Sequence, residues 1–216
     1  LLGYEYVRDV KPGEIVTITN DGMEVLQFAE EKTTFHCIFE HVYFSRPDSR
    51  VDDEYIDKFR RRMGKTLSDE HPAEDADIVI SVPDSSNTAA LGFANHSGTK
   101  FEMGLIRNHY VGRTFIQPTP AMREMGVRLK FNPVGGVLKD KKVVVVEDSI
   151  VRGTTLKKLG MLLRDAGAKE LHVRVSSPPI RYPCYYGMDF SSHGELIADG
   201  KSVEEIRQHI GVDSLG

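Results

Sequence analysis

The sequence predicts an α/β protein built on a doubly wound, mainly parallel sheet that helices cover on both faces. Two short apolar runs without polar alternation, at 78–80 and 143–146, are typical of strands buried on both sides, as the strands of parallel sheets are, and residues 171–175 predict a third strand. Helical patterns at 88–96 and 155–166 lie between or after these runs. Strands that alternate with helices in this way form parallel sheets with two covered faces.

The beginning of the chain predicts a hairpin outside this alternation. Apolar runs at 13–19 and 23–28 enclose Asn20-Asp21-Gly22, which is a strong turn signal. We therefore expect two antiparallel strands within the first 30 residues.

Three further segments complete the expected elements. The run at 37–44 is rich in aromatic and β-branched residues and predicts a strand. Residues 52–67 predict a helix that opens at Asp52 and Asp53, because acids suit a helix N-terminus and apolar side chains then recur at helical spacing. Residues 202–210 predict a last short helix.

The composition excludes several classes of protein. A chain of 216 residues with 40% hydrophobic content can bury one substantial core. The net charge of −4 gives no overall support for binding nucleic acid or an acidic membrane. No apolar run approaches the roughly 18 residues of a membrane span. The two cysteines give no disulfide framework, so we expect a cytoplasmic protein.

The most informative segment runs from Lys142 to Thr155. Its apolar strand ends in two adjacent acids, Glu147 and Asp148, and a loop of small and hydroxyl residues leads into an amphipathic helix. Carboxylates suit the hydroxyls of a ribose, and backbone N–H groups at a helix start suit a phosphate, so the segment predicts a sugar-phosphate site at the carboxyl edge of the sheet. The predicted binding residues of the loop and helix start are Ser149, Ile150, Val151, Arg152, Gly153, Thr154 and Thr155. Taken alone, the two acids are also compatible with a turn or a helix cap.

A second candidate loop follows the strand at 78–82. Its residues are Pro83, Asp84, Ser85 and Ser86. Their N–H groups and hydroxyls can hold a diphosphate, although an ordinary Pro-Asp turn with a serine helix cap has the same pattern. Neither a Walker loop nor a dinucleotide-binding G-x-G-x-x-G motif occurs in the chain, so nucleoside triphosphates and dinucleotides are not the expected ligands.

The connection at 107–132 is long and locally basic. Its charged residues are Arg107, Arg113, Arg123, Arg128 and Lys130 against Glu124. Long connections inside a compact domain are usually flexible lids or disordered segments, and a basic lid in an acidic protein predicts an anionic substrate. A solvated cationic loop is the simpler alternative.

Five segments recur in order over most of the chain and carry a resemblance to a known family. They are 43–49, 82–86, 108–117, 147–155 and 176–180. Together they resemble the type I phosphoribosyltransferases, which bind phosphoribosyl pyrophosphate (PRPP), and most closely the amidophosphoribosyltransferase family. The acid-pair motif alone indicates only the superfamily, whereas residues 110–116 and the whole set indicate the narrower family.

The resemblance implies a transferase reaction. In it, ammonia, taken from glutamine in the intact enzyme, displaces pyrophosphate from C1 of PRPP and gives phosphoribosylamine, in the first step of purine biosynthesis. The implied Mg²⁺ site consists of Ser85, Glu147 and Asp148, and the implied catalytic lid residues are Arg107, Tyr110, Arg113 and Lys130. Arginine stands at position 107 where a lysine is common, which keeps the charge but changes the geometry of phosphate contact. The resemblance also implies a homo-oligomer that purine nucleotides inhibit.

The resemblance further implies a domain organisation. Residues 1–30 resemble the tail of a glutaminase domain, and residues 31–216 resemble a phosphoribosyltransferase domain with a truncated C-terminus. Leu1 is not the nucleophilic cysteine that begins such a glutaminase domain, so we expect the chain to use free ammonia at most. Cys37 and Cys184 match two of the four ligand positions of an iron–sulfur (4Fe–4S) cluster in members of the family. Buried core cysteines are the alternative interpretation.

Two other functions remain open on the sequence alone. A nucleobase phosphoribosyltransferase of the same fold would need a base-binding hood. A non-catalytic PRPP-sensing regulator could lose the lid and the diphosphate loop. Both of these elements are present and no helix-turn-helix pattern is evident, which disfavours the regulator.

Overall fold

The computed structural model describes residues 3, 5–110, 129–190 and 192–216. The chain divides into two compact units, Leu1–Cys37 and Ile38–Gly216. None of the helices in the described residues is both long and apolar enough to pass through a lipid bilayer.

The first unit contains the hairpin that the turn signal predicts. β1 (Glu14–Thr19) pairs antiparallel with β2 (Gly22–Gln27), and Thr19 lies opposite Gly22 at the turn. Gly22 has a φ of 136°, a conformation that glycine adopts at little cost because it has no Cβ. The predicted hairpin is therefore confirmed.

The second unit contains a four-stranded parallel sheet in the order β10-β9-β8-β5. Its strands are β5 (Ile78–Ser81), β8 (Lys142–Glu147), β9 (Glu170–Val175) and β10 (Ser214–Leu215). Three of them match the strands that the sequence predicts at 78–80, 143–146 and 171–175, and each neighbouring pair is parallel. The apolar pattern does not predict β10, because a strand of two residues is too short to show a period.

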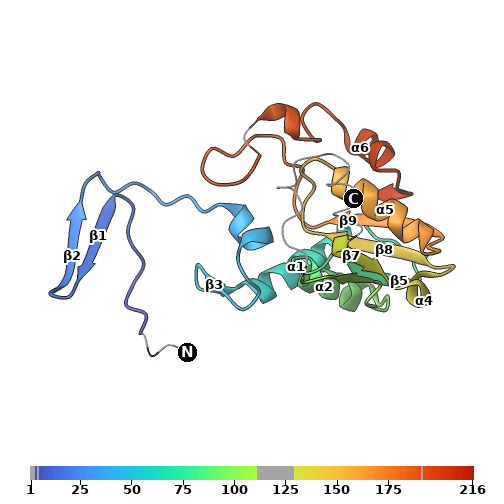
Figure 1. The fold of residues 1–216 in the computed structure, drawn as a ribbon, viewed down its shortest axis with the longest axis horizontal. Coiled ribbons are helices and arrows are strands. Elements are labelled where there is room, and N and C mark those ends of the chain that lie inside the picture. Colours follow the sequence, from blue (N-terminus) through green and yellow to red (C-terminus); the bar gives the residue numbers. More distant parts are fainter. Residues whose placement is uncertain (1–2, 4, 111–128, 191) are drawn as a thin grey trace. The chain divides into compact units, whose positions relative to one another are not determined.

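Helices cover both faces of this sheet (Figure 1). They are α1 (Ile56–Glu70), α2 (Asn87–Ser97), α5 (Thr154–Asp165) and α6 (Val203–Ile210). Val144 and Val146 of β8 belong to the core formed with α1 and α2, and Val143 and Val145 belong to the core formed with α5 and α6. Successive side chains of a strand point to opposite faces, so a continuous apolar strand supplies both cores. The predicted sheet with two covered faces is confirmed.

Helix α1 begins later than its acidic flank predicts. β3 (Arg50–Val51) and β4 (Glu54–Tyr55) form a short antiparallel ribbon, and Asp52 and Asp53 lie in its turn with φ values of 50° and 63°. Aspartate tolerates this left-handed conformation better than most residues. The predicted start at Asp52 is therefore wrong, because a turn uses the same acids that suit a helix N-terminus.

The run at 37–44 does not form the expected strand. Residues Glu40–Phe44 form η1, a π-helical turn. The guanidinium of Arg60, a buried residue of α1, donates to the carbonyl oxygen of His41 at 2.7 Å and to that of Ser45 at 2.8 Å. These bonds satisfy carbonyl groups of the turn and hold it against α1, a tertiary contact that the local pattern cannot reveal.

The two ends of the long basic connection pair with each other. β6 (Leu105–Arg107) and β7 (Phe131–Pro133) form an antiparallel ribbon, and the Asn108 N–H donates to the Lys130 carbonyl at 2.7 Å. Residues 111–128, which include much of the predicted lid, lie outside the described residues. Two short elements complete the second unit: α4 (Gly135–Leu138) and η3 (His193–Glu195).

Candidate functional site

Two carboxylates lie at the carboxyl edge of the parallel sheet, where β8 ends. Glu147 is the last residue of β8, and Glu147 and Asp148 are both buried, with 8% and 4% of their surface exposed. The neighbouring strand β5 ends beside them, since the Val82 N–H donates to the Val146 carbonyl at 2.9 Å. Parallel pairing thus brings the acid pair and the loop after β5 to one edge, as the sequence predicts.

Three serine hydroxyls surround the acid pair. Ser85 donates to Asp148 Oδ2 and Ser149 donates to Asp148 Oδ1, both at 2.5 Å. Ser86 donates to Glu147 Oε1 at 3.1 Å. Ser85 and Ser86 come from the loop after β5, so the predicted diphosphate loop and the predicted ribose-binding acids form one site.

Burial and mutual repulsion make this pair costly to ionise. Burial raises the pKa of Glu147 well above the usual carboxyl range, and the charge of Asp148 raises it further. Burial also raises the pKa of Asp148, against the lowering effect of hydrogen bonds from Ser149 and Ser85 and of the Arg60 charge. Hydroxyl donors or a cation at the pair would stabilise its charged form.

The loop after the acids enters α5 at Gly153. This glycine is buried and has a φ of 72°, and no described side chain caps the helix that it precedes. A Cβ here would come within 2.6 Å of the Ile197 Cδ1 atom. Thr154 and Thr155 are exposed at the start of the helix. Uncapped N–H groups and exposed hydroxyls at a helix start suit a phosphate.

Arg152 ties this loop to a distant segment. Its guanidinium donates to the Glu195 carboxylate at 2.5 Å and to the Asp189 carbonyl at 3.2 Å. The Ile197 N–H donates to the Val151 carbonyl at 2.8 Å. The sequence predicts ligand contacts for Arg152 and Val151, whereas these bonds join both residues to the protein itself. Glu195 and Ile197 carry no motif, so sequence reasoning missed them.

Asp84, in the loop after β5, contacts the start of the predicted lid. The Arg107 guanidinium donates to the Asp84 carboxylate at 2.8 Å. This ion pair places a predicted lid cation beside the loop that opens with Pro83. Within the described part of the chain, Arg107 Nε is buried and has no hydrogen-bond partner.

The other predicted lid residues are only partly placed. Tyr110 is fully exposed, and the Lys130 ammonium lies 5.1 Å from the centre of the Phe131 ring. Arg113 lies outside the described residues. The lid roles of Tyr110, Arg113 and Lys130 stay predictions.

The acid pair and Ser85 fit a Mg²⁺ ion by the chemistry of their atoms. Mg²⁺ prefers oxygen ligands and is usually held by one or two carboxylates together with substrate oxygens and water. Glu147 and Asp148 supply two carboxylates whose burial favours a cationic partner. Among residues 3, 5–110, 129–190 and 192–216, no group of three or more His, Cys, Asp or Glu side chains could hold a metal by itself.

The two cysteines are not buried core residues. Cys37 is exposed in the first unit, and Cys184 is partly buried in the second. The Tyr186 N–H donates to the Cys184 sulfur at 3.4 Å, and this bond, with others from the neighbouring backbone, lowers the pKa of the thiol. The core interpretation is therefore wrong. The cluster interpretation stays a prediction, and these thiols would supply two of the four ligands that a cluster normally takes.

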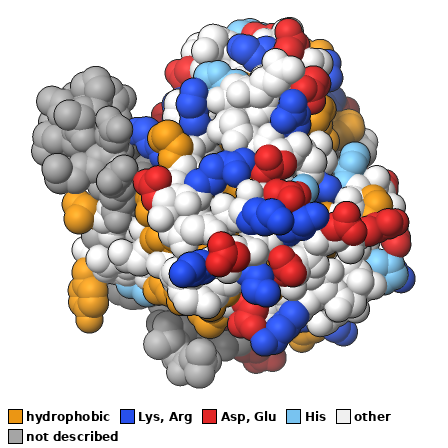
Figure 2. Space-filling view, turned by 90° about the vertical axis from the view of Figure 1, so that its right-hand side faces the viewer, with side chains coloured by type: hydrophobic (Ala, Val, Ile, Leu, Met, Phe, Trp, Pro, Cys, Tyr) orange, Lys and Arg blue, Asp and Glu red, His pale blue; other side chains and the backbone are white. Residues whose placement is uncertain are grey.

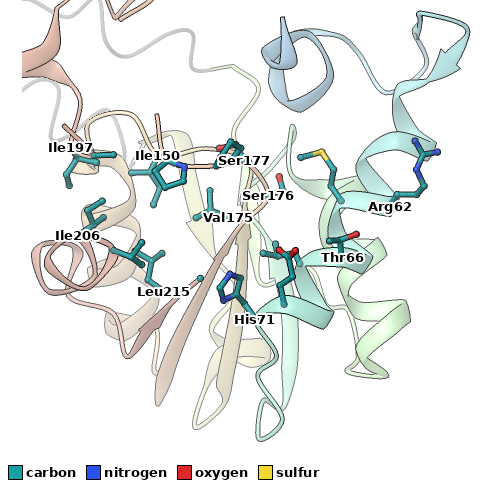
Figure 3. Close-up of a pocket in the computed structure, with 18 of the residues that line it drawn as sticks. Arg62, Thr66, His71, Ile150, Val175, Ser176, Ser177, Ile197, Ile206 and Leu215 are labelled. Atoms are coloured by element: carbon teal, nitrogen blue, oxygen red, sulfur yellow. The ribbon is translucent and has the colours of Figure 1, made fainter. Parts of the chain in front are cut away.

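An apolar groove of about 530 Å³ is lined in part by Ile150, one of the predicted loop residues (Figure 3). Figure 3 shows Arg62 and Thr66 on one side of it, Ile150, Ile197, Ile206 and Leu215 on the other, and His71, Val175, Ser176 and Ser177 between them. Glu147 and Asp148 are not among its lining residues. Apolar walls do not suit a sugar phosphate, so we place the site at the acid pair and not in the groove.

Basic and acidic side chains are interspersed on the face that Figure 2 shows. Among the described residues on this face, no large area carries one sign of charge, in line with the net charge of −4. Proteins that bind nucleic acid through its phosphates usually show a basic patch or stripe.

The chain is similar in sequence to amidophosphoribosyltransferases along its whole length. It is 52% identical over 215 residues to the Bacillus subtilis protein, a match that covers 100% of this chain and 45% of the relative. The Pyrococcus horikoshii protein is 52% identical over 209 residues, covering 97% of this chain and 46% of the relative. A chloroplastic form from Arabidopsis thaliana is 51% identical over 215 residues, covering 100% and 38%. No family model matches the chain.

Solved structures share this fold. The allosteric regulatory enzyme of purine biosynthesis matches with a TM-score of 0.84 and 51% identity, covering 98% of this chain and 45% of that chain. The glutamine PRPP amidotransferase from B. subtilis, complexed with ADP and GMP, matches with a TM-score of 0.84 and 52% identity, covering 97% and 46%. The four-stranded parallel sheet is therefore that of the PRPP amidotransferase structures. The chain is a homologue of the amidophosphoribosyltransferases and spans 38–46% of the length of these relatives.

Proposed function

We propose that this chain is the PRPP-binding part of an amidophosphoribosyltransferase. It transfers ammonia to C1 of PRPP, releases pyrophosphate and forms 5-phosphoribosylamine, in the first step of de novo purine biosynthesis. One observation carries the proposal: a buried carboxylate pair, a serine loop and an uncapped helix start meet at one edge of the sheet. These three features suit the ribose hydroxyls, the pyrophosphate and the 5-phosphate of PRPP in turn.

The acid pair and the helix start together orient the sugar. Glu147 and Asp148 accept hydrogen bonds from the ribose hydroxyls, and the hydroxyls of Thr154 and Thr155 donate to the 5-phosphate with the first N–H groups of α5. Gly153 allows the backbone to approach the phosphate closely. A ribose held at both ends presents C1 to the attacking nitrogen in a fixed geometry, which removes much of the entropic barrier.

The reaction breaks the bond between C1 and a pyrophosphate oxygen and forms a bond between C1 and the ammonia nitrogen, which then loses a proton. Positive charge develops on the ribose ring, beside the acid pair, and negative charge develops on the pyrophosphate. Ser85 and Arg107 lie at the loop that would hold the pyrophosphate. The Arg107 guanidinium would stabilise that negative charge as a fixed donor. A bound Mg²⁺ ion would add positive charge to the pyrophosphate oxygens. Lys130 and Arg113 on the lid would exclude water from the reaction.

We propose the partners that the resemblance implies as part of the same function. Glutamine would supply ammonia through a glutaminase domain of which residues 1–30 are the tail, and residues 31–216 would form the phosphoribosyltransferase domain. Purine nucleotides would inhibit a homo-oligomer, and the B. subtilis structure complexed with ADP and GMP supports the nucleotide part. The lowered pKa of the Cys184 thiol supports a 4Fe–4S cluster that Cys37 and Cys184 would help to hold.

One assay separates this function from its alternatives. The chain is incubated with PRPP and Mg²⁺ and with either ammonium or a panel of nucleobases, and pyrophosphate release is measured. Release that requires ammonium supports the proposal. Release with a base would indicate a nucleobase phosphoribosyltransferase, and PRPP binding without turnover would indicate a sensing domain. Glutamine in place of ammonium is tested in parallel as the nitrogen donor.

A further inference from the structure

Ser86 stands at the start of α2 but does not cap the helix. Serine is a preferred N-cap residue because its side-chain oxygen accepts a hydrogen bond from an N–H group of the first turn. In α2 the Ser86 side chain makes no such bond, and 0% of the residue is exposed. A fully buried hydroxyl that does not cap its helix needs another partner.

That partner is the acid pair. Ser86 Oγ donates to Glu147 Oε1 at 3.1 Å and lies 3.5 Å from Asp148 Oδ2. The Asp148 N–H also donates to Glu147 Oε1 at 3.1 Å. Both bonds converge on one oxygen at the far end of a long, flexible side chain, so together they fix its orientation.

The acid pair requires such a restraint. When both carboxylates are ionised, Glu147 and Asp148 carry like charges at the end of one strand, and rotation of Glu147 away from Asp148 would relieve their repulsion. A hydrogen bond to a charged group is stronger than one between neutral groups. Ser86 is buried, so its bond does not compete with water. It therefore opposes the rotation that would carry Glu147 away from a bound ribose.

We propose that Ser86 is a positioning residue, which holds the Glu147 carboxylate in the orientation that binds the ribose without itself touching PRPP. This inference rests on the proposed function, because it takes the acid pair as the ribose site. It changes the role that the sequence predicts for Ser86, which was contact with the ligand. A side chain with no exposed surface cannot make that contact, whereas Ser85 is partly exposed.

The test compares Ser86→Ala with Thr88→Val in this chain. Thr88 is a matched control, because it is a buried hydroxyl residue of the same helix turn whose Oγ1 has no hydrogen-bond partner among the described residues. The dissociation constant of PRPP with Mg²⁺ is measured by calorimetry, and the urea midpoint of unfolding is measured beside it. We expect about tenfold weaker binding for Ser86→Ala, from the loss of one hydrogen bond to a charged group. Thr88→Val should bind PRPP as the unmodified chain does.

A lower urea midpoint for Ser86→Ala with unchanged PRPP affinity would show a purely structural serine and overturn the inference. If Ser86→Ala does not fold, Ser86→Cys, a weaker donor of similar size, takes its place, and undiminished affinity would again overturn it. Failure of the unmodified chain to bind PRPP would instead overturn the proposed function. In that case crystal structures of the chain and of Ser86→Ala decide: a displaced Glu147 carboxylate supports the positioning role, and an unmoved one rejects it.

Discussion

The Ser85 hydroxyl donates a hydrogen bond to Asp148 Oδ2 at 2.5 Å, across 63 residues of sequence. This contact joins the loop after β5 to the acids after β8. It forms because the two strands are parallel neighbours, whose carboxyl ends lie at the same edge. The chemistry of the site therefore depends on the pairing of these strands as much as on the acid motif itself.

Asp148→Asn should weaken PRPP binding strongly. The asparagine side chain keeps the size of the aspartate but loses its negative charge. In the parent chain, the Asp148 carboxylate accepts hydrogen bonds from Ser85 and Ser149 and would accept bonds from the ribose. Hydrogen bonds to charged groups contribute about 1.5–3 kcal/mol each, so we expect a loss in that range by calorimetry with PRPP and Mg²⁺. Asp140→Asn, at an exposed turn with a φ of 60°, is the control and should bind normally. A loss below about 1 kcal/mol for Asp148→Asn would argue against the assigned role.

Glu147→Gln should raise stability at neutral pH while it weakens PRPP binding. Burial and the Asp148 charge raise the pKa of Glu147 in the folded chain, so the folded state holds the proton more tightly than the unfolded state does. The contribution of this group to stability is then greatest below its unfolded pKa of about 4.3 and falls as pH rises through the raised folded value. Urea midpoints of the variant and the parent chain should coincide in acid and diverge towards neutral pH, with the variant higher. A lower midpoint for the variant at neutral pH would contradict the sign of this argument.

Gly64→Ala should destabilise the packing of α1 on α2. A Cβ at Gly64 would lie 1.9 Å from the Ala89 carbonyl oxygen, and one at Gly92 would lie 2.2 Å from the Arg61 carbonyl oxygen. Helices α1 and α2 approach so closely that an added Cβ must push their backbones apart. Overpacking of this kind costs about 1–3 kcal/mol, which urea denaturation would detect.

The control for this substitution is Gly136→Ala. Gly136 lies in α4, and a Cβ there would meet nothing within 4 Å. We expect that variant to be neutral or more stable by up to about 1 kcal/mol, since alanine has the higher helix propensity. Equal stability of Gly64→Ala and the parent chain would show that the two helices separate at little cost.

The sequence predicts the sheet and the acid pair because both depend on local patterns. Two of the buried strands are continuous apolar runs, and Glu147 and Asp148 directly follow the run of four valines at 143–146. The features that escaped prediction depend on contacts between distant residues. Arg60 donates to carbonyl groups of the helical turn that replaces the expected strand at 37–44, and Glu195 holds the loop before α5 through Arg152.

Gly153→Ala should abolish tight binding of the 5-phosphate. Gly153 has a φ of 72°, and its added Cβ would lie 2.6 Å from Ile197 Cδ1, so the loop must shift as well as bear backbone strain. Gly98→Ala separates these two effects, because Gly98 ends α2 with a φ of 74° and a Cβ there would meet nothing within 4 Å. Both variants should lose about 1 kcal/mol or more of stability from the left-handed conformation. Only Gly153→Ala should lose affinity for ribose 5-phosphate in a calorimetric titration. An equal loss of affinity in both variants would show that general destabilisation, and not the shape of the loop, controls phosphate binding.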